Sequence, residues 1–81
     1  MIRHTDIGRS ELRQKIDGGE IRFAGNGRLR IYGSLTCASG KRMKRENRVF
    51  FADDTGAVRT GFRPCGHCMR AAYQEWAAPR R

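Results

Sequence analysis

The sequence has few acidic residues and no long apolar segment. Eight Asp and Glu stand against seventeen Lys and Arg, which gives a formal net charge of +9 at pH 7. No run of about 20 apolar residues is present, so the sequence predicts no membrane-spanning helix. The polar residues 1–4 also lack the apolar character of a signal peptide. We therefore expect a cytoplasmic protein that does not insert into membranes.

Cysteine is scarce as well, and its number is odd. The three cysteines, Cys37, Cys65 and Cys68, cannot form a closed set of disulfides within the chain. In a reducing compartment, spare thiols more often hold a metal than form disulfides. A chain of 81 residues makes one small domain, and small cores usually need a metal, disulfides or a partner chain. These features together favour a metal-stabilised domain.

The spacing of the cysteines indicates zinc. Cys65 and Cys68 are separated by two residues, so one tight turn points both sulfurs at one position, and tetrahedral zinc needs four such ligands. The pair precedes a segment with helical periodicity, and a helix N-terminus favours thiolates. A redox pair is the alternative, but it needs a βαβ pattern that this sequence lacks. Cys37 is the expected third ligand, unless it is a small buried thiol with no ligand role.

The fourth ligand is left open by the sequence. His67 lies inside the Cys-x-x-Cys turn, where a side chain normally points away from the metal. His4 is remote in sequence but can fold back, and we favour His4. Asp6 or a water molecule are further alternatives, and water would leave the open position that catalytic zinc sites keep.

The hydrophobic pattern predicts an α+β fold that begins with a helix and a β-hairpin. Ser10 caps a helix over residues 11–16, and Gly18 ends it. Two alternating arms, residues 20–24 and 28–32, surround an Asn-Gly pair, which predicts a hairpin. The side chains expected on its core face are Ile21, Phe23, Leu29 and Ile31.

Three more elements are expected after the hairpin. Residues 49–51 predict a short buried strand, and Asp53 or Asp54 caps a short helix through residues 57–59. A C-terminal helix follows the last cysteine, and apolar side chains recur along it at helical spacing. We interpret that stripe as core packing; it comprises Met69, Ala72, Tyr73 and Trp76.

The basic residues predict a partner of opposite charge. Residues 41–48 hold five positive charges in eight positions, between the expected metal loop and a strand. Such density attracts polyanions, nucleic acid first, although a solvated basic surface without a partner is the alternative. The expected phosphate contacts are Arg22, Arg28, Arg30, Lys41, Arg42, Lys44, Arg45 and Arg48.

Three segments resemble a known family when they are taken together. They are Arg-Ile-Tyr-Gly-Ser-Leu-Thr-Cys at 30–37, Lys-Arg-Glu-Asn-Arg-Val-Phe-Phe-Ala at 44–52 and Gly-Phe-Arg-Pro-Cys-Gly-His-Cys at 61–68. In this order they resemble the zinc-binding domain at the N-terminus of Ada DNA-repair proteins, and more closely a group of small stand-alone bacterial proteins. The resemblance covers about residues 25–76 of a single domain over 1–81, in which 1–24 carries the N-terminal helix and the first strand.

The resemblance implies a zinc ion, Zn²⁺, with Cys37, Cys65 and Cys68 as three of its ligands. In Ada proteins a fourth cysteine, in the motif Ile-Tyr-Cys-x-x-x-Cys, accepts a methyl group from a DNA phosphotriester, and the methylated protein then activates transcription. That position falls on Gly33, which has no side chain to bind zinc or to accept a methyl group. We therefore expect a non-catalytic module that binds zinc and DNA. The alternatives are a methyl acceptor that uses a remaining thiolate, and a protein-interaction module with an acidic partner.

Overall fold

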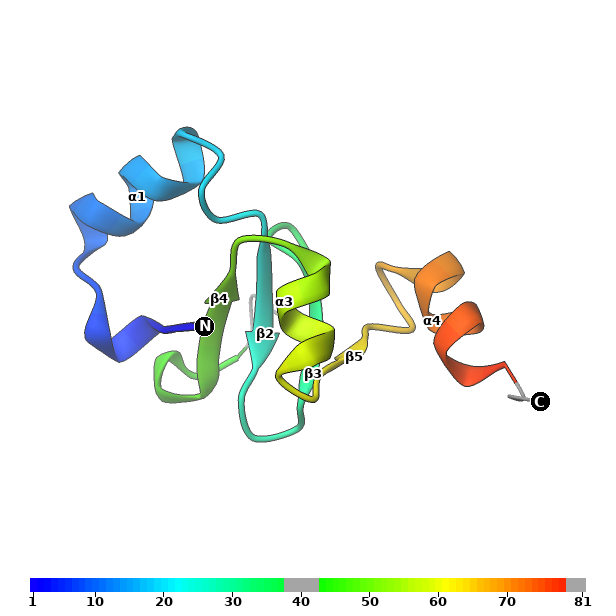
Figure 1. Cartoon of the computed structure of the whole chain (residues 1–81). Coiled ribbons are helices and arrows are strands. Elements are labelled where there is room, and N and C mark those ends of the chain that lie inside the picture. The colour runs from blue at the N-terminus through cyan, green and yellow to red at the C-terminus, as the bar shows by residue number, and fades with distance from the viewer. Residues whose placement is uncertain (38–42, 79–81) are drawn as a thin grey trace.

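A five-stranded sheet forms the centre of the molecule (Figure 1). The computed structural model describes residues 1–37 and 43–78. The strand order is β1-β4-β2-β3-β5, antiparallel throughout except that β5 pairs with β3 in parallel. The strands are β1 (Ile2–Arg3), β2 (Phe23–Asn26), β3 (Ile31–Ser34), β4 (Arg48–Phe51) and β5 (Arg63–Pro64).

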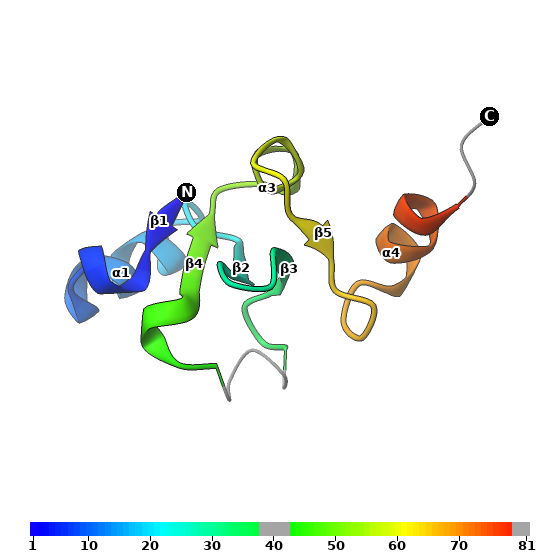
Figure 2. The same ribbon diagram turned by 90° about the horizontal axis from the view of Figure 1, so that it is seen from below.

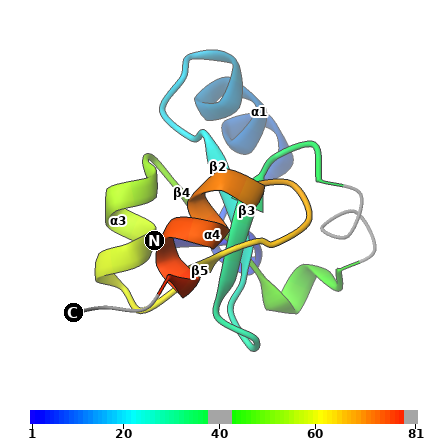
Figure 3. The same ribbon diagram turned by 90° about the vertical axis from the view of Figure 1, so that its right-hand side faces the viewer.

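Three short α-helices and two 3₁₀ turns surround the sheet, which confirms the α+β fold. Figures 1 and 2 show α1 at one end of the molecule and α4 at the other, with the sheet between them. Seen from the α4 end, α3 covers one side of the β2–β3 hairpin and η2 lies on the other (Figure 3). No helix in the described ranges is long and apolar enough to cross a membrane. The elements are η1 (His4–Asp6), α1 (Arg9–Asp17), η2 (Arg45–Asn47), α3 (Asp54–Arg59) and α4 (Arg70–Ala77).

The helix signals in the sequence locate α1 and α3 well. The N-terminal helix begins one residue before Ser10, with Gly8 at the N-cap position, so Ser10 is not its cap. Gly18 ends that helix as expected. The expected cap of α3 is confirmed, because the Asp53 carboxylate accepts a hydrogen bond of 2.6 Å from the amide of Gly56. Side-chain capping therefore marks the start of α3, whereas α1 begins without a capping side chain.

The hairpin is present, but its turn is longer than the Asn-Gly pair suggests. Asn26 is the last residue of β2 and pairs with Ile31, so residues 27–30 form a four-residue turn. The Oδ1 atom of Asn26 accepts hydrogen bonds from the amides of Arg28 and Leu29, at 2.9 and 3.0 Å. The Asn26 side chain therefore stabilises the turn by hydrogen bonding to its backbone.

The longer turn changes which side chains face the core. Leu29 lies on the turn with 62 % of its surface exposed, so the prediction that it packs in the core was wrong. Tyr32 takes a core position instead, at 2 % exposed, and Ile31 is half-buried. Arg30, at a positive φ of 59°, ends the turn, and its carbonyl oxygen accepts from the amide of Arg63 at 2.9 Å.

Aromatic side chains fill the core between the sheet and α3. The Phe51 and Phe62 rings meet edge to face, with 4.9 Å between their centroids. The predicted strand over residues 49–51 is confirmed as part of β4, and all three of its side chains are buried. The main cluster consists of Tyr32, Val49, Phe51, Ala57 and Phe62.

The C-terminal helix lies at the edge of this core. Met69, just before α4, packs against the cluster, but no residue of α4 itself is buried. Trp76 is 43 % exposed, so the prediction that it packs in the core was wrong. Its ring stacks on Tyr73, and the Arg63 guanidinium lies over both rings, at 5.8 and 5.3 Å from their centroids. α4 therefore contacts β5, which is an edge strand of the sheet.

Candidate metal centre

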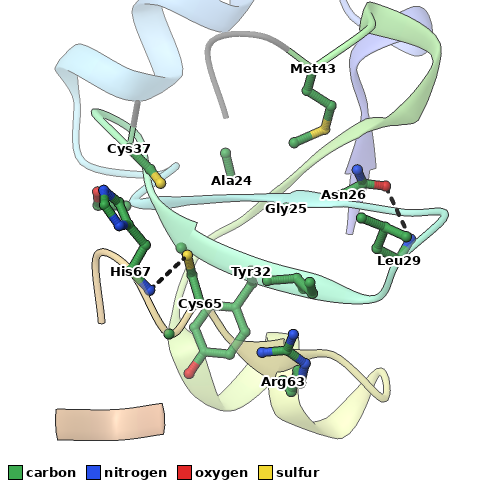
Figure 4. Close-up of a pocket in the computed structure, with 14 residues that line it drawn as sticks. Ala24, Gly25, Asn26, Leu29, Tyr32, Cys37, Met43, Arg63, Cys65 and His67 are labelled. Atoms are coloured by element: carbon green, nitrogen blue, oxygen red, sulfur yellow. Dashed lines mark hydrogen bonds between the residues drawn. The ribbon is translucent and has the colours of Figure 1, made fainter. Parts of the chain in front are cut away.

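The three cysteines converge at one edge of the sheet. Their Sγ atoms all lie within 4.8 Å of one another. Cys37 follows β3 and Cys65 follows β5, and these two strands are parallel neighbours. The amide of Cys65 donates to the carbonyl oxygen of Tyr32 at 2.7 Å, which extends that pairing to the first residue of the Cys-x-x-Cys turn. The sheet therefore brings Cys37 to Cys65 and Cys68, and Figure 4 shows Cys37 and Cys65 at this site.

Backbone amides point at two of the sulfur atoms. The amide of Ser34 donates to the Sγ of Cys68 at 3.4 Å. The amide of His67 donates to the Sγ of Cys65 at 3.4 Å, and Figure 4 shows this second hydrogen bond as a dashed line. Such donors stabilise negative charge on sulfur and are common around metal-bound thiolates. The donor set and its hydrogen bonds fit a thiophilic metal ion such as zinc.

The electrostatics of Cys68 link metal binding to proton release. Burial raises the pKa of the Cys68 thiol above its ordinary value, and hydrogen bonds to Cys37 and Cys65 act in the same direction. The hydrogen bond from the Ser34 amide opposes this rise in pKa. Because a metal ion binds the thiolate, binding must release the proton that burial retains.

The comparison with known families agrees with this geometry. A family model described as the metal binding domain of Ada matches residues 19–70, which is more than half of the chain. The chain belongs to the Ada metal-binding domain family. The matched segment of this Ada domain contains β2 to β5 and all three cysteines. No curated protein and no solved structure matches the chain.

Gly33 lies directly against the sulfur atoms of this Ada domain. A Cβ atom built on Gly33 would stand 2.6 Å from the Sγ of Cys68 and 3.2 Å from the Cβ of Cys65. The position that resembles the first ligand of the Ada motif is therefore next to the metal centre, but it offers no side chain. The eight residues outside the described ranges, 38–42 and 79–81, include no His, Cys, Asp or Glu.

His4 lies far from the three sulfurs. It belongs to η1, next to β1, and strands β4 and β2 separate β1 from β3, a span of about 14 Å at the usual strand spacing. Its imidazole packs edge to face on Phe50, with 5.3 Å between centroids. Among the described residues, the group able to hold a metal contains neither His4 nor Asp6, which is also in η1. The expectation that His4 supplies the fourth ligand therefore disagrees with the fold, because β1 pairs with β4 at the opposite edge.

His67 lies close to the metal centre without belonging to the three-sulfur group. It is exposed, and it lines a cavity together with Cys37 and Cys65. Figure 4 shows its imidazole on the Cys37 side of the Cys-x-x-Cys turn. The structure thus brings His67, rather than His4, near the sulfur atoms.

Two of the predicted phosphate contacts share a cleft. Arg28 and Arg30 line a cleft of about 280 Å³ together with Arg3, at the end of the sheet where the hairpin turns. Sequence reasoning missed Arg3, because nothing in two residues predicts that β1 joins the sheet. Glu46 is the one carboxylate among the described residues that line this cleft.

The other predicted contacts that the structure describes do not line this cleft, although Arg45 and Arg48 flank Glu46 and Asn47, which do. Arg22 is exposed at the start of β2, at the end of the strand opposite to the hairpin turn, and its Nε donates to the carbonyl of Gly19. Lys44 and Arg45 are exposed around η2, and Arg48 is half-buried at the start of β4. Lys41 and Arg42 lie outside the described residues.

Proposed function

We propose that this Ada domain holds zinc through Cys37, Cys65 and Cys68 and contacts DNA phosphates through the cleft of Arg3, Arg28 and Arg30. When bound, zinc ties the segment after β3 to the Cys-x-x-Cys turn, so its binding energy becomes folding energy. The arginine cleft is the observation that supports the choice of DNA.

The charge balance of the cleft favours a phosphate partner. The ion pairs recorded in the described part of the chain join Arg13 to Asp17 and Lys15 to Glu20, and neither involves an arginine of the cleft. Arg30 is held in place, since its guanidinium lies over the Phe62 ring at 5.4 Å. Guanidinium groups that are not neutralised by carboxylates bind phosphate oxygens bidentately.

The glycine at position 33 argues against methyl transfer at the first ligand position. A methyl acceptor needs a nucleophilic atom at the first ligand position, and glycine supplies none. We therefore propose binding of DNA without transfer of a methyl group to that position.

DNA binding is tested by fluorescence anisotropy with a labelled duplex at several salt concentrations. We expect affinity to fall with salt, and Arg28→Gln and Arg3→Gln each to reduce the salt slope by about 1. Arg13→Gln on α1 is the matched control, because Arg13 is an exposed arginine away from the cleft. Binding that ignores salt, or that both cleft variants leave unchanged, would refute the DNA proposal.

Zinc binding is tested separately by native mass spectrometry. The wild type and His4→Ala should each carry one zinc ion, whereas Cys68→Ser should bind it more weakly. Loss of zinc in His4→Ala alone would contradict the ligand set proposed above.

A further inference from the structure

A cavity of about 340 Å³ opens beside the sulfur atoms, and the proposed function does not use it. Cys37 and Cys65 line one side of it, together with Gly33. Its other walls include the apolar side chains of Ala24 and Met43. Cavities of this volume accept small organic molecules.

Gly33 keeps the metal centre accessible from this cavity. The glycine is buried, lines the cavity, and has the Sγ of Cys68 and the Cβ of Cys65 as its nearest side-chain neighbours. Any side chain at this position would project among the sulfur atoms. With glycine, a donor atom from outside the chain can approach Cys37 and Cys65 through the cavity that they line.

We propose that the cavity binds a small organic thiol whose sulfur takes the fourth coordination position of the zinc ion. This inference rests on the proposed zinc binding by Cys37, Cys65 and Cys68. Zinc accepts a fourth sulfur readily, and the apolar walls suit an alkyl or aryl group attached to it. The thiol's S–H bond breaks as the zinc–sulfur bond forms, and the proton leaves to solvent, so no oxidant or reductant takes part.

The surroundings offset the charge that a fourth thiolate adds. Four thiolates on one zinc ion carry a charge of about −2, which is costly to bury without compensation. Arg63 lines the same cavity, and the chain as a whole carries +9. The amides of Ser34 and His67 already donate to two of the sulfurs.

His67 is the competitor from within the chain. It lines the cavity, and an imidazole nitrogen is an ordinary zinc ligand. The two possibilities differ in what a histidine substitution does. If the thiol proposal holds, His67→Ala leaves three-sulfur binding intact and still admits the thiol.

Cobalt(II) absorption tests the inference. Cobalt can replace zinc, and its absorption spectrum depends on the number of sulfur ligands, whereas zinc has no such spectrum. Cobalt-loaded wild type and His67→Ala are titrated with benzyl mercaptan, and benzyl methyl sulfide is the control because it cannot form a thiolate. We expect the mercaptan alone to shift the ligand-field bands and to strengthen the sulfur-to-cobalt charge-transfer band in both proteins. Native mass spectrometry of the zinc protein should then show one zinc ion plus one mercaptan.

Two variants close the site in different ways. Gly33→Cys supplies a fourth sulfur from the chain and should lose the response to mercaptan. Because that side chain is crowded by Cys68, Ala24→Leu is the second variant: it fills the cavity from β2, and should weaken the mercaptan response while the mercaptan-free spectrum stays unchanged.

The outcomes separate this inference from the proposed function. A cobalt spectrum without three sulfur ligands would overturn both. A three-sulfur spectrum that ignores mercaptan would overturn the thiol site alone. A spectrum that changes in His67→Ala before any mercaptan is added would assign the fourth position to His67, and would likewise overturn the thiol site.

Discussion

Gly25 lies in the sheet core at a position that leaves no room for a side chain. A Cβ atom there would lie 2.9 Å from the carbonyl oxygen of Ile31, and 3.2 and 3.3 Å from ring carbons of Phe51 and Phe62. We therefore expect Gly25→Ala to lower the free energy of unfolding by about 1–3 kcal/mol through overpacking. Urea unfolding of the zinc-loaded protein measures the change.

Gly27→Ala is the matched control for Gly25→Ala. Its added Cβ would meet Val49 and the carbonyl oxygen of Asn47 at 3.4 and 3.5 Å, which are ordinary contacts. The control should therefore unfold at nearly the wild-type urea concentration. Equal losses in the two variants would mean that crowding at Gly25 is not the cause.

His4 makes stability depend on pH. Burial lowers its pKa below the usual 6.5, and the positive charges of Arg45 and Arg48 lower it further. The unfolded chain therefore takes up the proton first, so the contribution of His4 is complete above about pH 6.5 and is lost as the pH falls towards the folded-state pKa. We expect the stability of the wild type, relative to His4→Phe, to fall as the pH is lowered from about 7 through the ordinary pKa of 6.5.

The His4→Phe variant preserves the ring that packs on Phe50 while removing the titrating group. Thermal unfolding of both proteins at saturating zinc gives the comparison, since acid also weakens zinc binding and affects both alike. Parallel curves of stability against pH would show that His4 does not titrate in this range.

Some ligands of the candidate metal centre could be predicted from the sequence and others could not. The spacing of Cys65 and Cys68 predicts two adjacent sulfurs, because a tight turn is a local structure, and the structure brings Cys37 to the same place. The fourth ligand depends on which strands are neighbours, and no local pattern gives that information. The chemistry of His4 suggests a ligand, but its place in the fold depends on β1 joining the sheet beside β4, which the sequence does not indicate.

At the scale of elements, α3 is a six-residue helix that depends on its cap. The Asp53 carboxylate accepts a hydrogen bond from the amide of Gly56. The helix contributes Ala57 to the core, where it is fully buried. We expect Asp53→Ala to cost about 1 kcal/mol of stability. Thr55→Ala, an exposed position in the same helix, is the control and should change the urea midpoint much less. A loss equal to that of Thr55→Ala would show that the cap hydrogen bond contributes nothing.

Elements with local signals were predictable, and those without were not. The helix expected over 11–16, the strand expected over 49–51 and the Asp53 cap all rest on signals within a few positions, and the structure has each of them, the helix over 9–17 and the strand over 48–51. Strands β1 and β5 have two residues each, too few to show a period. Their membership in the sheet comes from pairing with distant segments, which tertiary contacts decide.

The hairpin shows how a correct local signal can give an incorrect register. Asn26 does stabilise the turn, but it does so with its side chain from the end of β2, before a four-residue loop, and not as one of two turn residues. The arms consequently pair so that Tyr32 enters the core, while Leu29 remains on the loop. Loop length, rather than the alternating pattern alone, decided which side chains are buried.

At the scale of the whole molecule, the described structure has a sheet core and a separate C-terminal end. The buried cluster joins β3, β4, α3 and the residue before β5, whereas α4 has no buried residue. Only Met69, among the residues from 69 to 77, packs against this cluster. The molecule is elongated, at 44 × 23 × 20 Å, with α4 at one end (Figure 1). Besides the Cys-x-x-Cys turn that precedes it, α4 contacts the sheet through β5, where the Arg63 guanidinium lies over the Tyr73 and Trp76 rings.

Removal of zinc should consequently act unevenly along the chain. We expect a chelator to increase amide hydrogen exchange first in the Cys-x-x-Cys turn and α4, because few apolar contacts hold them once the sulfurs are released. The amides shared by β2 and β4 should stay protected longest, since these strands are central in the sheet and carry core residues. Cys68→Ser should reproduce the pattern without chelator, and Arg13→Gln, distant from the sulfurs, should not. If exchange instead rises uniformly in all strands as zinc leaves, the metal holds the entire fold together, and the sheet core is too small to persist without it.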